Sequence, residues 1–422
     1  MTKLNFEKTG CSGSAPHDLR CSLTRGLPHS LRRSFTRILP LNLRRSFTRM
    51  AALGVTIAVL GSAGLASACS KSLEVSDDKS GQTEIVLYNW GEYIAEDTIA
   101  NFEAAYPQYK VVSRYFETNE TMYPNLTNSY DVIIPSEYMV CRLIREDKLQ
   151  KVDMSLLPNV TKNMDPLFKT VQYDQDTTVS DSVLAYGVPY MYCTVGLVYD
   201  ANKVTLDPDT TDPAAIWGVL FDPQYKNRVG MYDSMRESVG VALNYFGSSL
   251  NTTDAAELAQ AQQLLLDQKK NMSPTYGVDN LKDKLASGEL VASEAWSGDH
   301  QVILSRIEEL GNSDKIDLQY VLPEGSNWSV DLMCIPQNAK NVEGAHAFIN
   351  YMYDAQIALA NCEYVGYSTP NVEAKALLAD EVKNNKSYYP DAATFKTLEI
   401  FYSSSTIEEA YTALWNTVKA SS

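Results

Sequence analysis

A short apolar run opens the part of the chain whose pattern predicts a folded domain. It lies in residues 84–94, Glu-Ile-Val-Leu-Tyr-Asn-Trp-Gly-Glu-Tyr-Ile, where Ile85–Leu87 has the length and apolarity of a strand covered on both faces. Asn89–Gly91 then carries residues that favour a turn. Ligands of open α/β sheets bind beyond the carboxyl ends of strands. The pattern therefore places Trp90 and Tyr93 where a ligand would be met, with ordinary interior aromatics as the alternative.

The following segments alternate between the periods of helices and strands. Apolar residues at helical spacing predict a helix within residues 94–106, and alternation over residues 110–116 predicts a second strand. Val132–Ile134 is again an apolar run typical of a buried strand, and Ser136 and Tyr138 follow it. Two strand ends thus present the same combination of polar and aromatic side chains, which strengthens the interpretation of a ligand site.

Two further helices are indicated in the second half of the chain. Asp254 and Glu257 have the spacing of an N-cap and N3 pair ahead of an apolar helical face that ends at Leu265. Residues 342–352 also have apolar positions at helical spacing, which predicts an amphipathic helix there.

Residues 1–68 have a different character and predict an export signal with an upstream leader. They carry ten Lys and Arg against two acids, and the uncharged segment Met50–Ala68 follows the last Arg and ends in small residues. A basic region, an apolar region and a small-residue cleavage site in this order are typical of a secretory signal. The apolar region is rich in Gly, Ala and Ser, so a permanent membrane span is the weaker alternative.

Cys69 directly follows these small residues and resembles the lipid-modified cysteine of bacterial lipoproteins. Cleavage after Ala68 without lipidation is the alternative, because Ala66 stands where the lipoprotein pattern usually has Leu. Arg44–Phe47 also resembles a twin-arginine export signal, which leaves the export route open. Residues 69–82 are almost entirely small, polar or charged, and we interpret them as the anchor cysteine with a flexible tether.

Charge separates the leader from the rest of the chain. Residues 1–68 have a net charge of +8, so removing them from a chain of net charge −16 leaves −24 on 354 residues. A strongly acidic exported protein repels nucleic acid and attracts cationic solutes, although many soluble proteins are acidic without a cationic partner. The length of the remainder suggests two domains.

Short motifs along the rest of the chain resemble, in order, those of the spermidine/putrescine-binding periplasmic proteins of ABC importers. The motifs are Tyr88-Asn-Trp-Gly-Glu-Tyr93, Asn119-Glu-Thr-Met-Tyr123, Asp131-Val-Ile-Ile-Pro-Ser136, Gly187-Val-Pro-Tyr190, Trp296-Ser-Gly-Asp299, Asn338-Ala-Lys-Asn341 and Gly366-Tyr-Ser-Thr-Pro-Asn371. Each motif is weak by itself, but the ordered set extends over essentially the whole chain beyond the leader.

The resemblance implies a type II periplasmic-binding-protein fold, in which two α/β lobes enclose a ligand cleft. It implies lobe 1 over residues 83–200 and 331–375 and lobe 2 over residues 201–330 and 376–422, and Leu184–Tyr199 has the pattern of a strand that crosses between them. The expected function is that of a lipid-anchored protein in the periplasm or on the outer face of the cell membrane. It captures a polyamine and delivers it to an ABC import permease as a monomer, without cofactor, metal or catalysis.

A polyamine carries ammonium groups on an aliphatic chain, so its site needs carboxylates for the charges and aromatic walls for the methylenes. The residues that match the family's binding positions are Trp90, Tyr93, Ser136, Tyr138, Glu237, Trp296, Asp299, Asp331 and Tyr367. We expect Asp331, Glu237 and Asp299 to pair with the ammonium groups. The structural alternatives are a turn or cap at Asp331, a solvated first-turn carboxylate at Glu237 and a helix N-cap at Asp299.

Two positions depart from the family pattern. Ser234 stands where some spermidine-binding relatives have Asp, and we keep it as a candidate ligand-binding residue. With one acid fewer, a third ammonium lacks a dedicated partner, so we expect putrescine to bind at least as tightly as spermidine unless Glu92 or Glu137 turns inward. Ser329 stands where relatives tend to have an aromatic residue, and Trp328 one position earlier would face the other side of a strand.

Two rival functions are less well supported by the sequence. His300 and His346 are the histidines beyond the leader, and neither lies in a spaced cluster typical of a metal site or a catalytic triad. The same fold with another solute, such as iron, sulfate, a sugar or a different organic cation, is the nearer alternative. Three carboxylates among aromatic residues favour an organic cation over the inorganic ions.

The chain beyond Cys69 contains Cys141, Cys193, Cys334 and Cys362. An even number in an exported chain allows two disulfides, with three possible pairings. Cys193 and Cys334 lie in apolar runs where a buried free thiol is the commoner state, so we expect free thiols.

Overall fold

The computed structural model describes residues 81–175 and 183–421. The predicted export signal, Cys69 and all but the end of the predicted tether lie outside these residues, so all three stay predictions. Within the described chain no helix has the length and apolarity needed to cross a membrane.

Ten strands of the described chain form one sheet in the order β2-β1-β3-β10-β5-β8-β6-β7, with β4 paired to β10 and β9 paired to β5. The strands are β1 (Thr83–Trp90), β2 (Tyr109–Phe116), β3 (Val132–Ile133), β4 (Leu149–Gln150), β5 (Gly187–Asp200), β6 (Val229–Tyr232), β7 (Thr275–Gly277), β8 (Ala292–Trp296), β9 (Leu318–Val321) and β10 (Trp328–Pro336).

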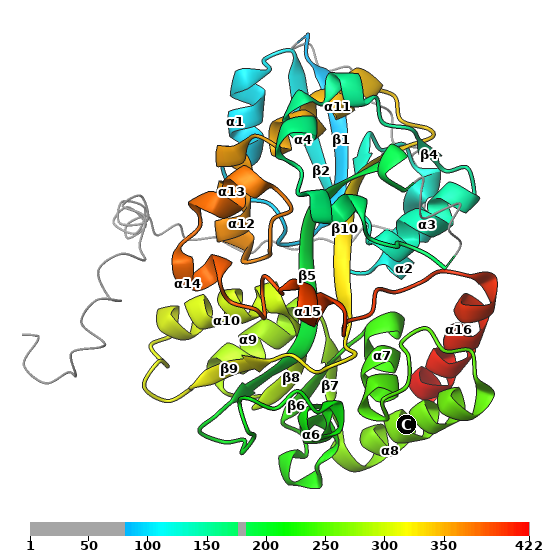
Figure 1. Ribbon diagram of the computed structural model, residues 1–422, viewed down its shortest axis with the longest axis vertical. Coiled ribbons are helices and arrows are strands. Elements are labelled where there is room, and N and C mark those ends of the chain that lie inside the picture. Colours follow the sequence, from blue (N-terminus) through cyan, green and yellow to red (C-terminus); the bar gives the residue numbers. More distant parts are fainter. Residues whose placement is uncertain (1–80, 176–182, 422) are drawn as a thin grey trace, which may run out of the picture. The chain divides into compact units, whose positions relative to one another are not determined.

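Helices cover both faces of this sheet (Figure 1). The α-helices are α1 (Thr98–Ala105), α2 (Asn119–Met122), α3 (Glu137–Arg145), α4 (Pro158–Asn163), α6 (Pro213–Gly218), α7 (Met235–Tyr245), α8 (Ala255–Met272), α9 (Asp279–Ser287), α10 (Ser297–Glu309), α11 (Val342–Met352), α12 (Ala355–Val365), α13 (Val372–Leu377), α14 (Asp380–Lys383), α15 (Ala392–Phe395) and α16 (Ser405–Ala420). Short 3-10 helices span Tyr123–Thr127, Met154–Leu156, Pro166–Lys169, Val183–Ala185, Val219–Phe221 and Pro223–Tyr225.

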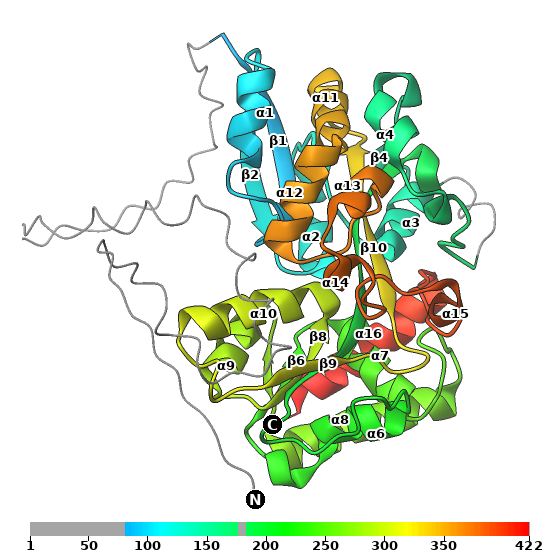
Figure 2. The same cartoon turned by 60° about the vertical axis from the view of Figure 1, so that its left-hand side comes forward.

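Two long strands connect two groups of elements, which Figures 1 and 2 show as an upper and a lower lobe. Below, lobe 1 denotes β1–β4 with α1–α4 and α11–α13, and lobe 2 denotes β6–β9 with α6–α10 and α16. β5 pairs with β10 up to Thr194 and then with β8 from Val195, so it passes from one lobe into the other. The predicted crossing strand is therefore confirmed, and so is the two-lobed α/β fold.

The strand β1 occupies the interior position that its apolar run predicts. It pairs in parallel with β2 on one side and with β3 on the other. Ile85 and Leu87 belong to one core with Phe102 of α1 and Phe348 of α11, whereas Tyr88 belongs to the core of the opposite face. A strand covered on both faces favours apolar residues at successive positions, which explains the uninterrupted run Ile85–Leu87.

The helix predictions also agree with the structure. Asp254 accepts hydrogen bonds from the backbone N–H groups of Ala256 and Glu257, which makes it the N-cap of α8. The helix α11 spans the predicted residues 342–352, and α1 lies within the predicted segment 94–106.

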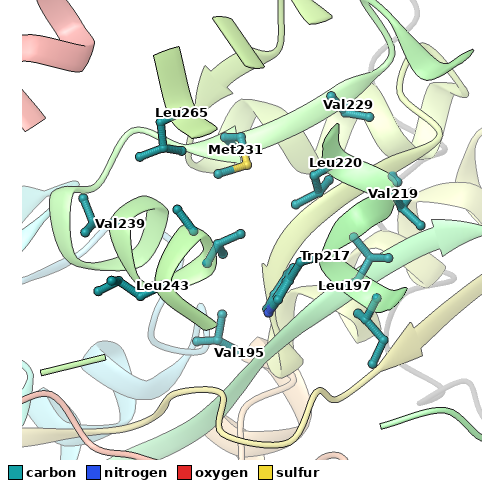
Figure 3. Packing of buried hydrophobic residues seen from close by; sticks show 14 of the residues in the cluster. Val195, Leu197, Trp217, Val219, Leu220, Val229, Met231, Val239, Leu243 and Leu265 are labelled. Carbon is teal, nitrogen blue, oxygen red and sulfur yellow. The ribbon is translucent and has the colours of Figure 1, made fainter. Parts of the chain in front are cut away.

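Lobe 2 has its own core between the sheet and α6, α7 and α8 (Figure 3). Val195 and Leu197 of β5 meet Trp217 of α6 there, and the indole Nε1 of Trp217 donates to Oδ1 of Asn244 at 2.7 Å. Each fully buried aliphatic side chain contributes about 1.5–3 kcal/mol by leaving water. Lobe 2 therefore has an apolar core that is distinct from the cores of lobe 1.

The chain after α13 follows lobe 1 before it joins lobe 2. Leu378, Tyr388 and Tyr389 belong to the same core as Ile133 of β3, whereas Tyr411 of α16 belongs to the core of lobe 2. The residue boundaries expected for the two lobes stay a prediction.

All four cysteines of the described chain are buried free thiols, Cys141, Cys193, Cys334 and Cys362. The expectation of free thiols is confirmed. Cys141, Cys334 and Cys362 belong to the core around Ile133, and Cys193 belongs to the core around Ile85, where free thiols pack as small apolar side chains.

Candidate functional site

A cavity lies between the lobes, and every residue of the predicted ligand site lines it. Its inner part has a volume of about 70 Å³. The predicted residues in its wall are Trp90, Tyr93, Ser136, Tyr138, Ser234, Glu237, Trp296, Asp299, Asp331 and Tyr367. The inner cavity shares Glu120, Tyr138 and Arg236 with a wider cleft of about 1330 Å³, so it opens into that cleft.

Asp331 lies at an irregular point of β10. The pairing register with β5 shifts between Asp331 and Leu332, and such a bulge re-aims a side chain out of the regular alternation. Its carboxyl accepts hydrogen bonds from the hydroxyls of Tyr93 at 2.6 Å and Ser136 at 2.7 Å. Asn119 donates to the Ser136 hydroxyl at 3.0 Å. Because side-chain hydroxyls hold this carboxyl, the interpretation of a turn or cap aspartate does not apply.

The electrostatic state of Asp331 follows from its burial. Burial, partly offset by the hydroxyls of Tyr93 and Ser136, raises the pKa of Asp331 to about 6. Among the described residues Asp331 has no ion-pair partner. The hydroxyls orient this carboxyl without neutralising it, which leaves its charge for a cationic group in the cavity.

Glu237 supplies a second carboxyl from the first turn of α7, in lobe 2. Its Oε1 accepts from the indole Nε1 of Trp296 at 2.9 Å, and its buried Oε2 has no hydrogen-bond partner among the residues described. Burial raises the pKa of Glu237 to about 7, although the Trp296 indole and Arg236 act in the opposite direction. Glu237 is only 8% exposed, so it is not the solvated carboxylate of the alternative interpretation.

Asp299 is the third carboxyl, and it already has partners. It lies in the first turn of α10 and accepts from the hydroxyls of Tyr232 at 2.7 Å and Tyr367 at 3.0 Å. The Nζ of Lys282 lies 3.6 Å from its Oδ1. The N-cap position of α10 belongs to Trp296, so the expected alternative of a capping aspartate is not what the structure has.

The glycine in the Trp296-Ser-Gly-Asp299 motif makes room for an aromatic wall. A Cβ at Gly298 would overlap the ring of Tyr367, so only glycine allows this ring to lie over the start of α10. The Tyr367 ring also makes an edge contact with Tyr93 at 5.2 Å between centroids. The glycine thereby brings an aromatic residue of lobe 1 onto a carboxyl of lobe 2.

Aromatic rings from both lobes form the apolar part of the wall. Trp90 of β1 meets Trp296 of β8 edge-on at 6.2 Å, and Trp90 also contacts Phe116 of β2 at 4.7 Å. The ring of Trp296 stacks on Tyr232 at 4.2 Å. Such rings cover the methylenes of an aliphatic chain and attract an ammonium through their faces.

The remaining predicted residues lie towards the wider cleft. The Tyr138 hydroxyl donates to Oε1 of Glu120 at 2.9 Å. Ser234 precedes α7 and makes no side-chain cap hydrogen bond. Next to it, Arg236 is buried, donates to three oxygens of the chain and stacks over Phe401 at 4.5 Å.

Neither Glu92 nor Glu137 replaces the acid that is missing at Ser234. Glu92 lines the cavity, but it forms ion pairs with Arg306 at 2.7 Å and Lys282 at 3.1 Å. Glu137 is fully buried behind β10, where it accepts from the Ser329 hydroxyl and the Val330 N–H at 2.9 Å each. Burial raises the pKa of Glu137 to about 8, so this carboxyl holds the β10 backbone as a largely neutral acid.

The strand parity predicted for Trp328 is confirmed. Ser329 lines the cavity, whereas Trp328 packs against Phe395 at 4.8 Å, outside the cavity wall. Two sequence-adjacent positions of β10 point to opposite faces, as the alternation of a strand requires. The aromatic residue that relatives place at this position is therefore absent from the wall.

His300, one of the two histidines weighed for a catalytic function, lies inside the fold. His300 is buried, its Nδ1 lies 2.6 Å from the Tyr388 hydroxyl, and burial lowers its pKa to about 4. Residues 81–175 and 183–421 contain no cluster of His, Cys, Asp and Glu that could hold a metal ion.

Sequence reasoning missed several charged residues of the wall, among them Lys282, Arg236 and Glu120. All three lie on helices or helix ends whose charged residues look like an ordinary solvated face in the sequence. The burial of Lys282 and Arg236 and the position of Glu120 in the wall depend on how α9, α7 and α2 pack around the cavity, and no local pattern encodes that packing.

Two α/β lobes with a cavity between them, walled by aromatic and carboxyl side chains, define a two-lobed solute-binding protein. The chain belongs to the family of bacterial extracellular solute-binding proteins, whose family model matches residues 97–390. The spermidine/putrescine-binding periplasmic protein of Salmonella typhimurium is 34% identical over 322 residues, which cover 75% of this chain and 85% of that relative.

Solved structures agree with this assignment. The spermidine/putrescine ABC transporter substrate-binding protein of Streptococcus pneumoniae is 32% identical, with a TM-score of 0.64 over 80% of this chain and 99% of that one. A lipoprotein of Treponema pallidum is 26% identical, with the same TM-score and the same shares covered. The resemblance stated from the motifs is therefore confirmed at the level of family and fold.

Proposed function

We propose that this protein captures a polyamine, putrescine or spermidine, and delivers it to an ABC import permease. The observation that carries the proposal is the pair Asp331 and Glu237, a partly buried and a buried carboxyl in an aromatic cavity, one from the crossing strand β10 and one from lobe 2. Relatives named as spermidine/putrescine-binding proteins, at up to 34% identity, support the choice of ligand.

The two carboxyls favour a cationic ligand, because a carboxylate in the cavity is unfavourable without a cationic partner. A buried carboxylate without a cation is unfavourable by several kcal/mol, and the raised pKa values of Asp331 and Glu237 express this cost. An aliphatic chain with an ammonium at each end relieves both costs at once. The rings of Trp90 and Trp296 cover the methylenes between the ends.

The residue roles follow from this arrangement. Asp331 and Glu237 pair with ammonium groups, and Tyr93 and Ser136 orient Asp331 through their hydroxyls. The ten predicted residues lie within one cavity wall, which supports their assignment as the ligand-binding set.

Calorimetric titration of purified protein tests the proposal. Putrescine and spermidine should bind with micromolar or tighter affinity, whereas 1,4-butanediol, of the same chain length without charge, should not bind. Tryptophan fluorescence should change on binding because Trp90 and Trp296 line the cavity. Binding of neither amine, or equal binding of butanediol, overturns the proposal. Native mass spectrometry of the protein as purified identifies any other solute.

We also propose that the protein lies outside the cytoplasm, and that it is a monomer without catalytic activity. The family is extracellular, and relatives are periplasmic, which supports the location. We further propose that residues 1–68 are an export signal and that Cys69 carries a lipid anchor. The T. pallidum relative is itself a lipoprotein. We also propose that two halves of the chain close on the ligand, with boundaries at residues 83–200 and 331–375 for one half and 201–330 and 376–422 for the other; the segment before α16 packs on the core of the first half.

A further inference from the structure

The third carboxyl of the cavity has a cation supplied by the protein itself. Lys282 lies on α9 with its side chain 7% exposed, and its ammonium is surrounded by three carboxyls. Its Nζ lies 2.8 Å from Oδ1 of Asp279, 3.1 Å from Oε2 of Glu92 and 3.6 Å from Oδ1 of Asp299. Lys282, Glu92, Asp279 and Asp299 all line the inner cavity, so this ammonium lies within the proposed ligand site.

The side chain of Lys282 stays protonated and therefore positively charged. Burial favours the neutral amine, but Asp299 and Asp279 outweigh it, and the pKa of Lys282 is raised. A buried ammonium that stays charged repels a second ammonium at the same carboxyl, because like charges a few ångströms apart interact strongly in a poorly solvated site.

The three carboxyls therefore differ in whether they already have a cationic partner within the protein. Asp331 is held by two hydroxyls and Glu237 by one indole N–H, and neither has a cationic partner at ion-pair distance among the described residues. Asp299 has two hydroxyls and the Lys282 ammonium. Two carboxyls of the cavity are thus left without a cationic partner and can pair with two positive charges on a ligand.

We propose that Lys282 acts as a built-in ammonium that occupies the third acidic position of the cavity and restricts the site to ligands with two ammonium groups. This specificity role rests on the proposed polyamine function and extends it, since it assigns diamines as the preferred substrate class. The absence of an acid at Ser234 and the pairing of Asp299 with Lys282 both disfavour a third ammonium group on the ligand.

The test compares putrescine and spermidine by calorimetry at pH 8 in the wild type and in Lys282→Met, which keeps the length of the stem and removes the charge. We expect the ratio of the spermidine Kd to the putrescine Kd to fall at least tenfold in Lys282→Met. Lys284→Met is the matched control, because Lys284 lies on the same helix, pairs with Glu289 and does not line the cavity. Its ratio should stay within twofold of the wild type.

The outcomes separate this inference from the function on which it rests. Wild-type protein that binds neither amine overturns the polyamine function. Wild-type protein that binds both, with an unchanged ratio in Lys282→Met, overturns the role of Lys282 alone, and so does wild-type binding of spermidine tenfold tighter than putrescine. Where thermal unfolding shows that Lys282→Met is not folded, Lys282→Gln carries the same comparison, because its amide still donates to a carboxylate.

Discussion

The affinity for a diamine should depend steeply on pH, because the two carboxyls expected to meet its ammonium groups titrate near neutrality. Burial raises the pKa of Glu237 to about 7 and that of Asp331 to about 6 in the protein without ligand. An ammonium binds the ionised carboxylate, so each carboxyl must lose its proton first. Primary amines keep their charge up to pH 9 or above, as lysine does, so the ligand does not titrate over the range of interest.

The magnitude follows from these two values. At pH 6 the protonated fractions weaken binding by about elevenfold through Glu237 and about twofold through Asp331, whereas at pH 8 both effects nearly vanish. The dissociation constant for putrescine should therefore be about twentyfold larger at pH 6 than at pH 8. The sign is fixed by the direction of the shifts: raised carboxyl pKa values make affinity fall as the pH falls.

Calorimetry at pH 6, 7 and 8 measures this change directly. At pH 7 each bound diamine should release about 0.6 proton, which appears as a dependence of the observed enthalpy on the ionisation enthalpy of the buffer. Glu237→Gln is the control, since it leaves only the contribution of Asp331 and should reduce the change between pH 6 and pH 8 to about twofold. A flat profile in the wild type would show that both carboxyls are ionised before binding and would refute the reasoning.

Four substitutions test other parts of the arrangement. Trp296→Ala should weaken polyamine binding by about 1–3 kcal/mol through lost burial and cation–π contact, and unaltered affinity by calorimetry removes this residue from the site. Asp331→Asn should cost about 2–5 kcal/mol with either polyamine, because an ammonium loses its buried partner; titration at pH 8 decides, and a loss below 1 kcal/mol contradicts the assignment. Gly298→Ala should weaken binding at least tenfold, because a methyl there overlaps the ring that closes the cavity, whereas Gly218→Ala, whose Cβ would lie no closer than 3.8 Å to any neighbour, should bind as the wild type does. Cys69→Ala should release the protein from the membrane fraction of producing cells, because a diacylglycerol group supplies the two chains that stable anchoring needs; retention of the variant on the membrane counts against lipidation.

Local patterns were sufficient for the elements that carry a strong period. The run Ile85–Leu87 predicted an interior strand, and Asp254 predicted a helix start, because burial on two faces and N-capping leave signatures within a few residues. The candidate site depended on a different kind of information. Asp331 and Glu237 are far apart in the sequence, and only the resemblance to a family placed them in one site.

The residues that sequence reasoning missed share one physical cause. Lys282 stands between Asp279 and Asp283, a spacing that indicates a solvated helix face with intrahelical ion pairs. Its burial arises because α9 packs beside α10 and against the turn that follows β1, where a Cβ at Gly91 would lie 3.2 Å from Oδ2 of Asp279. Such a contact joins segments almost two hundred residues apart, and no period in either segment reports it.

The acidity of the whole chain and the acids of the cavity act at different stages of capture. The net charge of −24 on the residues after Ala68 attracts every cation, but salt screens that field within about 8 Å at physiological ionic strength, so it speeds encounter without discriminating among amines. Discrimination among amines begins at Asp331 and Glu237 in the cavity, because water stabilises their charges less there than at the surface. A ligand with one ammonium leaves one of these carboxyls to take up a proton or remain uncompensated, whereas a diamine neutralises both. A third ammonium would meet Asp299 with the Lys282 ammonium already beside it. In this poorly solvated cavity a second ligand charge gains a carboxylate partner, whereas a third is repelled by Lys282.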